Sequence, residues 1–231
     1  MQSEIVKEAE SRKNEIQKAI IGWASFNIRS FPWRKKKEPY RTLITEILLR
    51  RTTASAVLRI YEKFFNQYPT IEHLAKAEKE ELEALLSTIG YHRQRAKMLK
   101  EVSMFVVKKW HGEIPQTPEE LLKIPHVGPY ISNAILSFCF DVPAAIVDSN
   151  VERVIKRMFY NHLPQKASLK IVQKVADVLV PEREHATYNF GLLDLGALIC
   201  RYASPHCARC PLKPLCDYGR KQSTMNSPEN T

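Results

Sequence analysis

Glycine is scarce in this sequence: 7 of its 231 residues are glycine, where average usage of about 7% would give about twice as many. Segments in which apolar and polar residues alternate, as they do in a half-buried strand, are also hard to find. Apolar residues recur instead at helical spacing along most of the chain. These patterns predict an all-α protein.

Acidic residues are outnumbered: 25 Asp and Glu residues face 35 Lys and Arg residues, for a formal net charge of +10. A surplus of this size makes a polyanion the first partner to consider and an anionic membrane surface the second. The hydrophobic content of 44% and the modest net charge per residue exclude a chain that is disordered for most of its length. A chain of this length suits one or two compact domains.

An apolar leader is missing, since charged residues begin at Glu4 and no signal-peptide core follows. The longest stretch without Lys, Arg, Asp or Glu runs from Ile124 to Phe140, and its prolines, Gly128 and Asn133 make it a poor membrane span. We therefore expect a soluble, cytoplasmic protein without membrane contact, associated with the nucleoid if the source is prokaryotic.

Helical periodicity is clearest over residues 41–66, with a break near Thr52–Ser55. Further helices are predicted over 70–77, 79–87, 93–110, 117–122, 130–139, 149–160, 167–180 and 187–199. The segment that begins at Thr117 has the signals of a helix start: a Thr cap, Pro at the first helical position and Glu in the capping box. The polar composition of residues 217–231 predicts a disordered tail.

Four of the five cysteines, Cys200, Cys207, Cys210 and Cys216, lie within 17 residues with the spacing Cys-x6-Cys-x2-Cys-x5-Cys. Without a secretory signal, this density indicates a metal site rather than two disulfides. Structural zinc sites commonly pair two short knuckles, and only one is present here, but the spacing leaves both zinc and an iron–sulfur cluster open. The fifth cysteine, Cys139, is predicted to be a buried core residue.

Three cations, Arg201, Arg209 and Lys213, lie beside these cysteines in the sequence. We expect them to offset the negative charge of the thiolates or to face phosphates.

Residues 121–138 predict a helix, a short turn rich in Pro and Gly, and a second helix. The amide groups after Val127, at the start of the second helix, are suited to a phosphate, and a plain helix–turn–helix connection is the alternative. Asp148 directly precedes a predicted helix, which by itself indicates an N-cap. Glu46 lies in an apolar segment, where the ordinary role is a surface ion pair with Arg50.

Taken in order, these motifs resemble the helix–hairpin–helix superfamily of DNA glycosylases that carry a C-terminal iron–sulfur loop, the group of endonuclease III and the adenine glycosylase. The resemblance covers Phe31 to Cys216. IPHVGPY is similar to the hairpin, VDSN to the segment of the catalytic aspartate, and the cysteine spacing to the 4Fe–4S loop.

Within that superfamily, the segments FPWR (31–34), PY (39–40), LITEILLRRTTA (43–54) and NFGLLDLGALIC (189–200) most resemble the thymine-DNA glycosylases that act on G:T mismatches. Tyr130 stands where endonuclease III has a lysine nucleophile, and the mismatch thymine glycosylases also have tyrosine there.

The resemblance implies two α-helical lobes with a DNA-binding cleft between them and Asp148 at its mouth. Residues 31–138 would form a six-helix barrel lobe with the helix–hairpin–helix at about 117–138. Residues 1–30 together with 139–216 would form the iron–sulfur cluster lobe.

The implied activity is that of a monofunctional DNA glycosylase in base excision repair, which hydrolyses the N-glycosidic bond of thymine, and of uracil, mispaired with guanine. Asp148 would stabilise the charged sugar and orient or deprotonate the attacking water, Glu46 would hydrogen-bond or protonate the leaving base, and Tyr130 would contact the flipped base. The implied partner is double-stranded DNA with a mismatched or damaged base, the implied cofactor is a 4Fe–4S cluster on the four cysteines, and the implied state is a monomer.

Family position also implies DNA contacts. Arg50, Arg51 and Tyr91 would fill the gap left by the flipped base and read the unpaired guanine. His126, Val127, Gly128 and Tyr130 would belong to the phosphate-binding hairpin. Cations at Lys35–Lys37, Arg93, Arg95 and Lys97 would attract phosphates independently of sequence.

The hairpin departs from the family pattern at two positions. His126 replaces a glycine and is expected either to strain the turn or to add a phosphate contact, and Pro129 removes a backbone donor.

Three alternatives stay open at this point. Glu46 is also the kind of acid that an adenine glycosylase acting on adenine opposite 8-oxoguanine or guanine requires, although such enzymes usually continue into a further domain after the cysteine loop. The altered hairpin is compatible with a non-catalytic protein that binds DNA lesions. The cysteines are compatible with a zinc-containing structural module.

Overall fold

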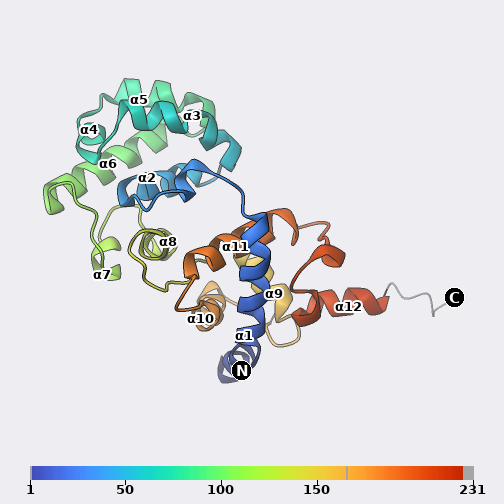
Figure 1. The fold of residues 1–231 in the computed structure, drawn as a ribbon. Helices are drawn as coiled ribbons and strands as arrows, with labels where there is room; N and C mark the ends of the chain where they lie inside the picture. The colour runs from blue at the N-terminus through green and yellow to red at the C-terminus, as the bar shows by residue number, and fades with distance from the viewer. Residues whose placement is uncertain (1, 165, 226–231) are drawn as a thin grey trace. The chain divides into compact units, whose positions relative to one another are not determined.

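The computed structural model describes residues 2–164 and 166–225, in which helices are present and strands are not. The predicted all-α fold is therefore confirmed (Figure 1).

The chain divides into two compact units: unit 1 is Met1–Arg29 with Val142–Thr231, and unit 2 is Ser30–Asp141. These divisions lie one and three residues from the lobe boundaries expected at 30/31 and 138/139. In the part of the chain that the structure describes, no helix has the length and apolar character needed to cross a membrane.

Unit 1 is built around the long first helix. It contains α1 (Gln2–Asn27), α9 (Ser149–Met158), α10 (Leu169–Leu179), α11 (His185–Leu198), the 3-10 helices η3 (Cys207–Arg209) and η4 (Lys213–Leu215), and α12 (Asp217–Met225). Helix α1 packs against α10 and α11, while α9 packs against α10, α11 and α12 (Figure 1). Ile16 and Ile20 of α1, one helical turn apart, are fully buried in this core together with Phe159 and Tyr188.

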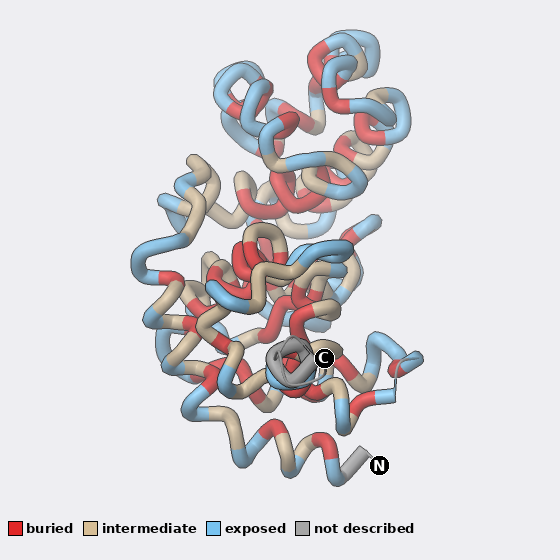
Figure 2. Tube along the Cα trace, turned by 90° about the vertical axis from the view of Figure 1, so that its right-hand side faces the viewer, coloured by how far each residue is buried: buried red, intermediate tan, exposed pale blue. Residues whose placement is uncertain are grey.

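Unit 2 is centred on α2, in which every residue from Thr42 to Leu48 is buried. The unit contains η1 (Pro32–Arg34), α2 (Pro39–Leu49), α3 (Ala54–Gln67), α4 (Ile71–Lys76), α5 (Lys79–Leu86), η2 (Ser87–Ile89), α6 (His92–Trp110), α7 (Pro118–Leu121) and α8 (Pro129–Cys139). These are seven α-helices where six were expected, and α7 is a single turn. Helix α2 packs against α3, α6 and α8, and α6 packs against α4 and α5. Figure 2 shows buried positions recurring between exposed ones along the helices, as one-sided burial requires.

The predicted helices are found within a few residues of their expected ends. The predicted break near Thr52–Ser55 separates α2 from α3, where Arg51 adopts a left-handed backbone with φ of 53° and the Thr53 hydroxyl accepts from the Ala56 amide at 3.2 Å. Thr117 precedes α7 as predicted, but its hydroxyl donates to the Glu120 carboxylate at 3.1 Å and makes no cap to the backbone.

The prediction of a disordered tail is wrong for its first part, because Asp217–Met225 form α12, whereas residues 226–231 lie outside the described residues. Asp217 is only 3% exposed. It accepts hydrogen bonds from Arg12 at 2.9 Å, Arg220 at 2.8 Å and the Asn161 amide at 3.1 Å. Burial alone would raise the pKa of Asp217, but these donors hold the pKa below its ordinary value. Because Arg12 lies on α1, the local sequence of the tail carries no sign of this contact.

We expect Asp217→Asn to lower the free energy of unfolding by about 1–3 kcal/mol, because Arg12 then keeps only Glu8 as an acidic partner and Arg220 loses its ion pair with Asp217. Glu152→Gln, which breaks the partly exposed Lys156–Glu152 pair on α9, is the matched control and should cost about 0.5 kcal/mol. Urea unfolding followed by circular dichroism measures both. Equal effects of the two substitutions would show that α12 is not anchored through Asp217.

Candidate functional site

Asp148 is the N-cap residue of α9 in unit 1. Its Oδ1 atom accepts from the backbone amides of Asn150 and Val151, both at 2.8 Å, and its Oδ2 atom accepts from the Asn150 side chain at 2.9 Å. The carboxylate is half-buried, so it combines a fixed orientation with access to solvent. The capping role predicted from the sequence is thus present, and it leaves one lone pair, on Oδ2, for a further partner.

The segment that carries Asp148 is held in place by α11. The buried side chain of Asn189 accepts from the Ile146 amide at 3.4 Å and donates to the Ala144 carbonyl at 2.9 Å. These bonds satisfy backbone groups of an extended stretch that has no strand beside it, and so determine where the chain enters α9.

Asn150 also connects Asp148 to the end of α11. Its Oδ1 atom accepts from Arg153 at 2.8 Å, and Arg153 in turn donates to the carbonyls of Gly196 and Cys200, both at 2.7 Å. A Cβ atom on Gly196 would lie 2.6 Å from the Asn150 Cβ, so only glycine allows this approach of α11 to α9. Sequence reasoning missed Asn150 and Arg153, because 43 residues separate Arg153 from Gly196 and nothing local marks the contact.

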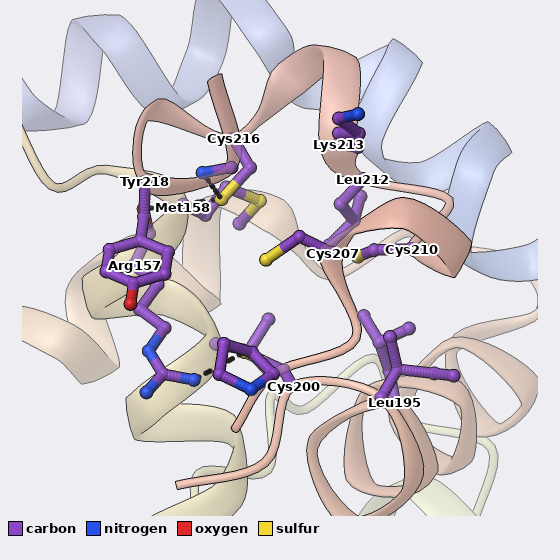
Figure 3. A pocket seen from close by; sticks show the side chains of 14 residues that line it. Arg157, Met158, Leu195, Cys200, Cys207, Cys210, Leu212, Lys213, Cys216 and Tyr218 are labelled. Atoms are coloured by element: carbon purple, nitrogen blue, oxygen red, sulfur yellow. Dashed lines mark hydrogen bonds between the residues drawn. The ribbon is translucent and has the colours of Figure 1, made fainter. Parts of the chain in front are cut away.

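The four clustered cysteines line one space in unit 1, between α9, the end of α11 and the loop with η3 and η4 (Figure 3). No Asp, Glu or His lines this space among the described residues. Burial, together with the neighbouring cysteines, raises the pKa of Cys207, that of Cys210 to about 12 and that of Cys216 to about 11.

Donors and cations lie close to these thiols. Arg157 donates to the Cys200 sulfur at 3.4 Å, and the Gly219 amide donates to the Cys216 sulfur at 3.4 Å. Lys213 lines the same space as predicted, whereas Arg201 and Arg209 are exposed and do not line it. Arg157, on α9, was missed because its place beside the loop depends on the packing of the unit. Among the described residues, no three metal-binding side chains converge closely enough to share one metal ion.

In unit 2, the structure brings together three residues predicted to contact DNA. Arg50, Arg51 and Tyr91 line one hollow of about 160 Å³, with Gln94 and Met98 of α6 beside them. Arg51 and Tyr91 both adopt left-handed backbone conformations, with φ of 53° and 50°, and the Tyr91 side chain is 59% exposed. Residues other than glycine rarely adopt this conformation and need their surroundings to hold them in it.

The hairpin turn is anchored through the residue that departs from the family pattern. His126 has a φ of 64°, so the turn keeps the left-handed backbone that glycine ordinarily supplies. Its Nε2 atom lies 2.5 Å from the Glu101 carboxylate on α6, and its carbonyl accepts from Arg50 at 3.4 Å. Two outcomes were expected for His126: a strained turn or a phosphate contact. The turn has the strained left-handed backbone, and the side chain is bound to Glu101.

The amide groups of the hairpin are only partly available. The Val127 amide donates to the Ile124 carbonyl at 3.1 Å, and Pro129 has no amide hydrogen. Because the Val127 amide is already bonded within the turn, we correct the assignment of Val127 as a phosphate contact. Gly128, the N-cap of α8, has no amide partner among the described residues, and Tyr130 follows in the first turn, half-buried.

Three other expectations for unit 2 are also corrected. Glu46 is 7% exposed and α2 ends at Leu49, before Arg50, so Glu46 does not lie on a solvated helix face. Cys139 is half-buried rather than in the core, and donates to the Thr42 hydroxyl at 3.2 Å. Arg95 is 4% exposed and is therefore no surface cation for phosphates.

The predicted site residues thus divide between the units. Unit 1 holds Asp148 and the four cysteines, and unit 2 holds Glu46, Tyr130, the hairpin and the hollow lined by Arg50, Arg51 and Tyr91.

Comparisons with known proteins agree with these features. The family described as "HhH-GPD superfamily base excision DNA repair protein" matches residues 44–180. The thymine/uracil-DNA glycosylase of Methanothermobacter thermautotrophicus is 39% identical over 213 residues, which are 89% of this chain and 93% of that protein. The adenine DNA glycosylase of Buchnera aphidicola subsp. Baizongia pistaciae is 33% identical over 198 residues, 85% of this chain and 56% of that protein. The solved structure of a thermostable thymine-DNA glycosylase has a TM-score of 0.84 and 38% identity, covering 91% of this chain and 99% of that chain.

The close approach at Gly196 leads to a stability prediction. We expect Gly196→Ala to lower the free energy of unfolding by about 1–3 kcal/mol, because its Cβ would push α9 away from α11. Gly22→Ala is the matched control: Gly22 lies inside α1, and no atom of the part of the chain that the structure describes lies within 4 Å of an added Cβ, so alanine should stabilise by about 0.5–1 kcal/mol. Denaturant unfolding distinguishes the opposite signs. A neutral Gly196→Ala would mean that the two helices separate without cost.

Proposed function

Because the chain belongs to the HhH-GPD superfamily of base excision DNA repair proteins, we propose that it removes thymine, and also uracil, mispaired with guanine in double-stranded DNA. The observation that carries this proposal is the Asp148 carboxylate, held by three N–H donors at the start of α9 in a chain 39% identical to a thymine/uracil-DNA glycosylase. The reaction is hydrolysis of an N-glycosidic bond.

The chemistry proposed for Asp148 follows from its geometry. As the glycosidic bond breaks, positive charge develops on the sugar, and an oriented carboxylate stabilises that charge and accepts a proton from the attacking water. The bonds from the Asn150 and Val151 amides hold the carboxylate in one orientation without reorganisation during the reaction. Asn150 is thus proposed as a positioning residue for Asp148.

The other catalytic roles are assigned to residues of unit 2. Glu46, buried on α2, is proposed to hydrogen-bond or protonate the departing base. Tyr130, in the first turn of α8, is proposed to contact the flipped thymine. A tyrosine offers no amine for a Schiff base, so we propose a monofunctional enzyme that leaves the strand intact at the abasic site.

The DNA contacts proposed for this chain begin with its charge of +10, which favours phosphate binding that weakens with salt. Gly128 and the first turn of α8 are proposed to face a phosphate at the positive end of the helix. The residues around the hollow, Arg50, Arg51 and Tyr91, are proposed to occupy the gap left by the flipped base and to contact the unpaired guanine.

The four cysteines fit a 4Fe–4S cluster, which we propose as the cofactor. They surround one space that no carboxylate or imidazole of the described residues lines, with Arg157 and Lys213 to offset negative charge. Four cysteines around one space are a usual ligand set of a 4Fe–4S cluster, and their spacing contains only one of the two short knuckles common in structural zinc sites. When bound, the cluster would cross-link residues 200–216 and hold the thiols as thiolates.

We expect single-turnover assays to show release of thymine from G:T and uracil from G:U duplexes, with strand breaks only after alkali. We expect Asp148→Asn to lower the G:T rate by about 100-fold or more, because asparagine cannot act as a base. Asparagine also caps helices well, so the free energy of unfolding should change by about 1 kcal/mol or less.

Asp177→Asn on α10, an exposed aspartate away from this chemistry, controls for the loss of a charge and should leave the rate unchanged. Release of adenine alone, from a duplex with adenine opposite 8-oxoguanine, would move the chain to the adenine branch. Full activity of Asp148→Asn would refute the mechanism, and no release from any duplex would favour a non-catalytic lesion-binding protein.

We expect the purified protein to hold about four irons per chain and to absorb at about 400 nm. Cys210→Ser should remove the iron and the absorbance, whereas Cys139→Ser, in the other unit, should keep both. Metal analysis and the visible spectrum measure this. Stoichiometric zinc in a colourless protein would overturn the cluster assignment.

A further inference from the structure

Arg95, on α6, has a guanidinium group that is bound entirely by backbone carbonyls. It donates to Ile47 at 3.2 Å, to Leu48 at 2.8 Å, to Arg50 at 2.5 Å and to Gly90 at 3.0 Å. Among the described residues no acidic side chain forms a salt bridge with it. A buried cation is thus stabilised by peptide dipoles alone.

Two of these carbonyls, those of Ile47 and Leu48, lie in the last turn of α2, and the third is that of its C-cap residue Arg50. The carbonyl end of a helix carries partial negative charge. The fourth, that of Gly90, belongs to the turn between η2 and α6. Burial, together with the nearby positive charge of Arg50, lowers the pKa of Arg95 from its ordinary value. Arg95 therefore joins two segments that are 40 or more residues apart in the sequence.

Both segments adopt unusual backbone conformations next to the bonded carbonyls. Arg50 is followed by Arg51, with a φ of 53°, and Gly90 is followed by Tyr91, with a φ of 50°. A left-handed conformation costs a residue other than glycine about 1–2 kcal/mol. Such residues keep this geometry only where neighbouring bonds determine it, and here the bonds come from Arg95.

The same two segments line the hollow in unit 2, and Arg95 lines it between them. We infer that Arg95 is a positioning residue for damage recognition: it sets the spacing between Arg50 and Arg51 on one side of the hollow and Tyr91 on the other. This inference rests on the function proposed above, in which these three side chains engage the gap in the duplex. Arg95 itself need not touch DNA.

The test compares binding to a duplex with a tetrahydrofuran abasic analogue opposite guanine and to a fully paired duplex of the same sequence, at one salt concentration. Arg95→Met should lower this preference, and the single-turnover G:T rate, by about tenfold or more, because small misplacements of positioning groups cost that much. Binding to the paired duplex should stay within about twofold, since phosphate contacts are unaffected. A general loss of folding would weaken both kinds of binding.

Lys100→Met is the matched control. Lys100 lies on the same helix and donates to two carbonyls at the end of α4, those of Ala75 and Ala77, both at 2.7 Å, but does not line the hollow. Lys100→Met should lower the melting temperature of the protein. It should leave the preference for the abasic duplex and the single-turnover G:T rate within about twofold of those of the natural chain. The single ammonium of Arg95→Lys cannot span both segments, so this variant should prefer the abasic duplex less than the natural chain does and more than Arg95→Met does. It provides the test if Arg95→Met fails to fold.

The inference is overturned if Arg95→Met and Arg95→Lys keep the natural preference, if Lys100→Met lowers it equally, or if the natural chain itself does not prefer the abasic analogue. Failure of the proposed function looks different: the natural chain would then release neither thymine nor uracil, whatever the binding preference of the variants.

Discussion

Helices end in carbonyl groups that have no partner within the helix, and in this chain long polar side chains from other helices satisfy them. Lys100 does so for α4, Gln17 for α10, Arg153 for the end of α11 and Arg95 for α2. Cations are favoured at these positions because the helix dipole is negative there. With few glycines available for helix ends, the chain uses such side chains to shape its turns, so the geometry of each turn depends on a residue elsewhere in the fold.

The residues proposed to act on DNA and the cysteine loop also lie next to helix ends, two at a start and one after a C-terminal end. Asp148 begins α9, Tyr91 precedes α6, and the loop of Cys200 follows α11. Arg153 satisfies the end of α11 and also bonds Asn150, which donates to Asp148, so the start of the cysteine loop and the orientation of the carboxylate share one arginine. In unit 1, a short series of hydrogen bonds therefore links the start of the cysteine loop to the carboxylate proposed to act on DNA.

The hairpin shows how a departure from a family pattern is accommodated. A histidine at position 126 keeps the left-handed turn, and its side chain finds a charged partner in Glu101 on α6. From the sequence, strain and a phosphate contact were both open for His126. Glu101 lies 25 residues upstream of His126, so the residues around the turn do not predict this contact. The same limit explains why Val127 and Arg95 were misassigned: a residue type indicates what a side chain is able to bind, but only burial shows which group it reaches.

By itself, the sequence determined the helices and their approximate ends, the break before α3, the capping role of Asp148 and the clustering of the cysteines. These features depend on periodicity, caps and spacing, which act over a few residues. The tertiary structure decided that Asp217 anchors α12, that the buried Arg95 binds backbone carbonyls at the end of α2, and that Arg157 faces the cysteines. Each of these features rests on a contact between residues 43 or more positions apart. A buried charge is costly unless it is paired, and its partner becomes available only when the chain folds.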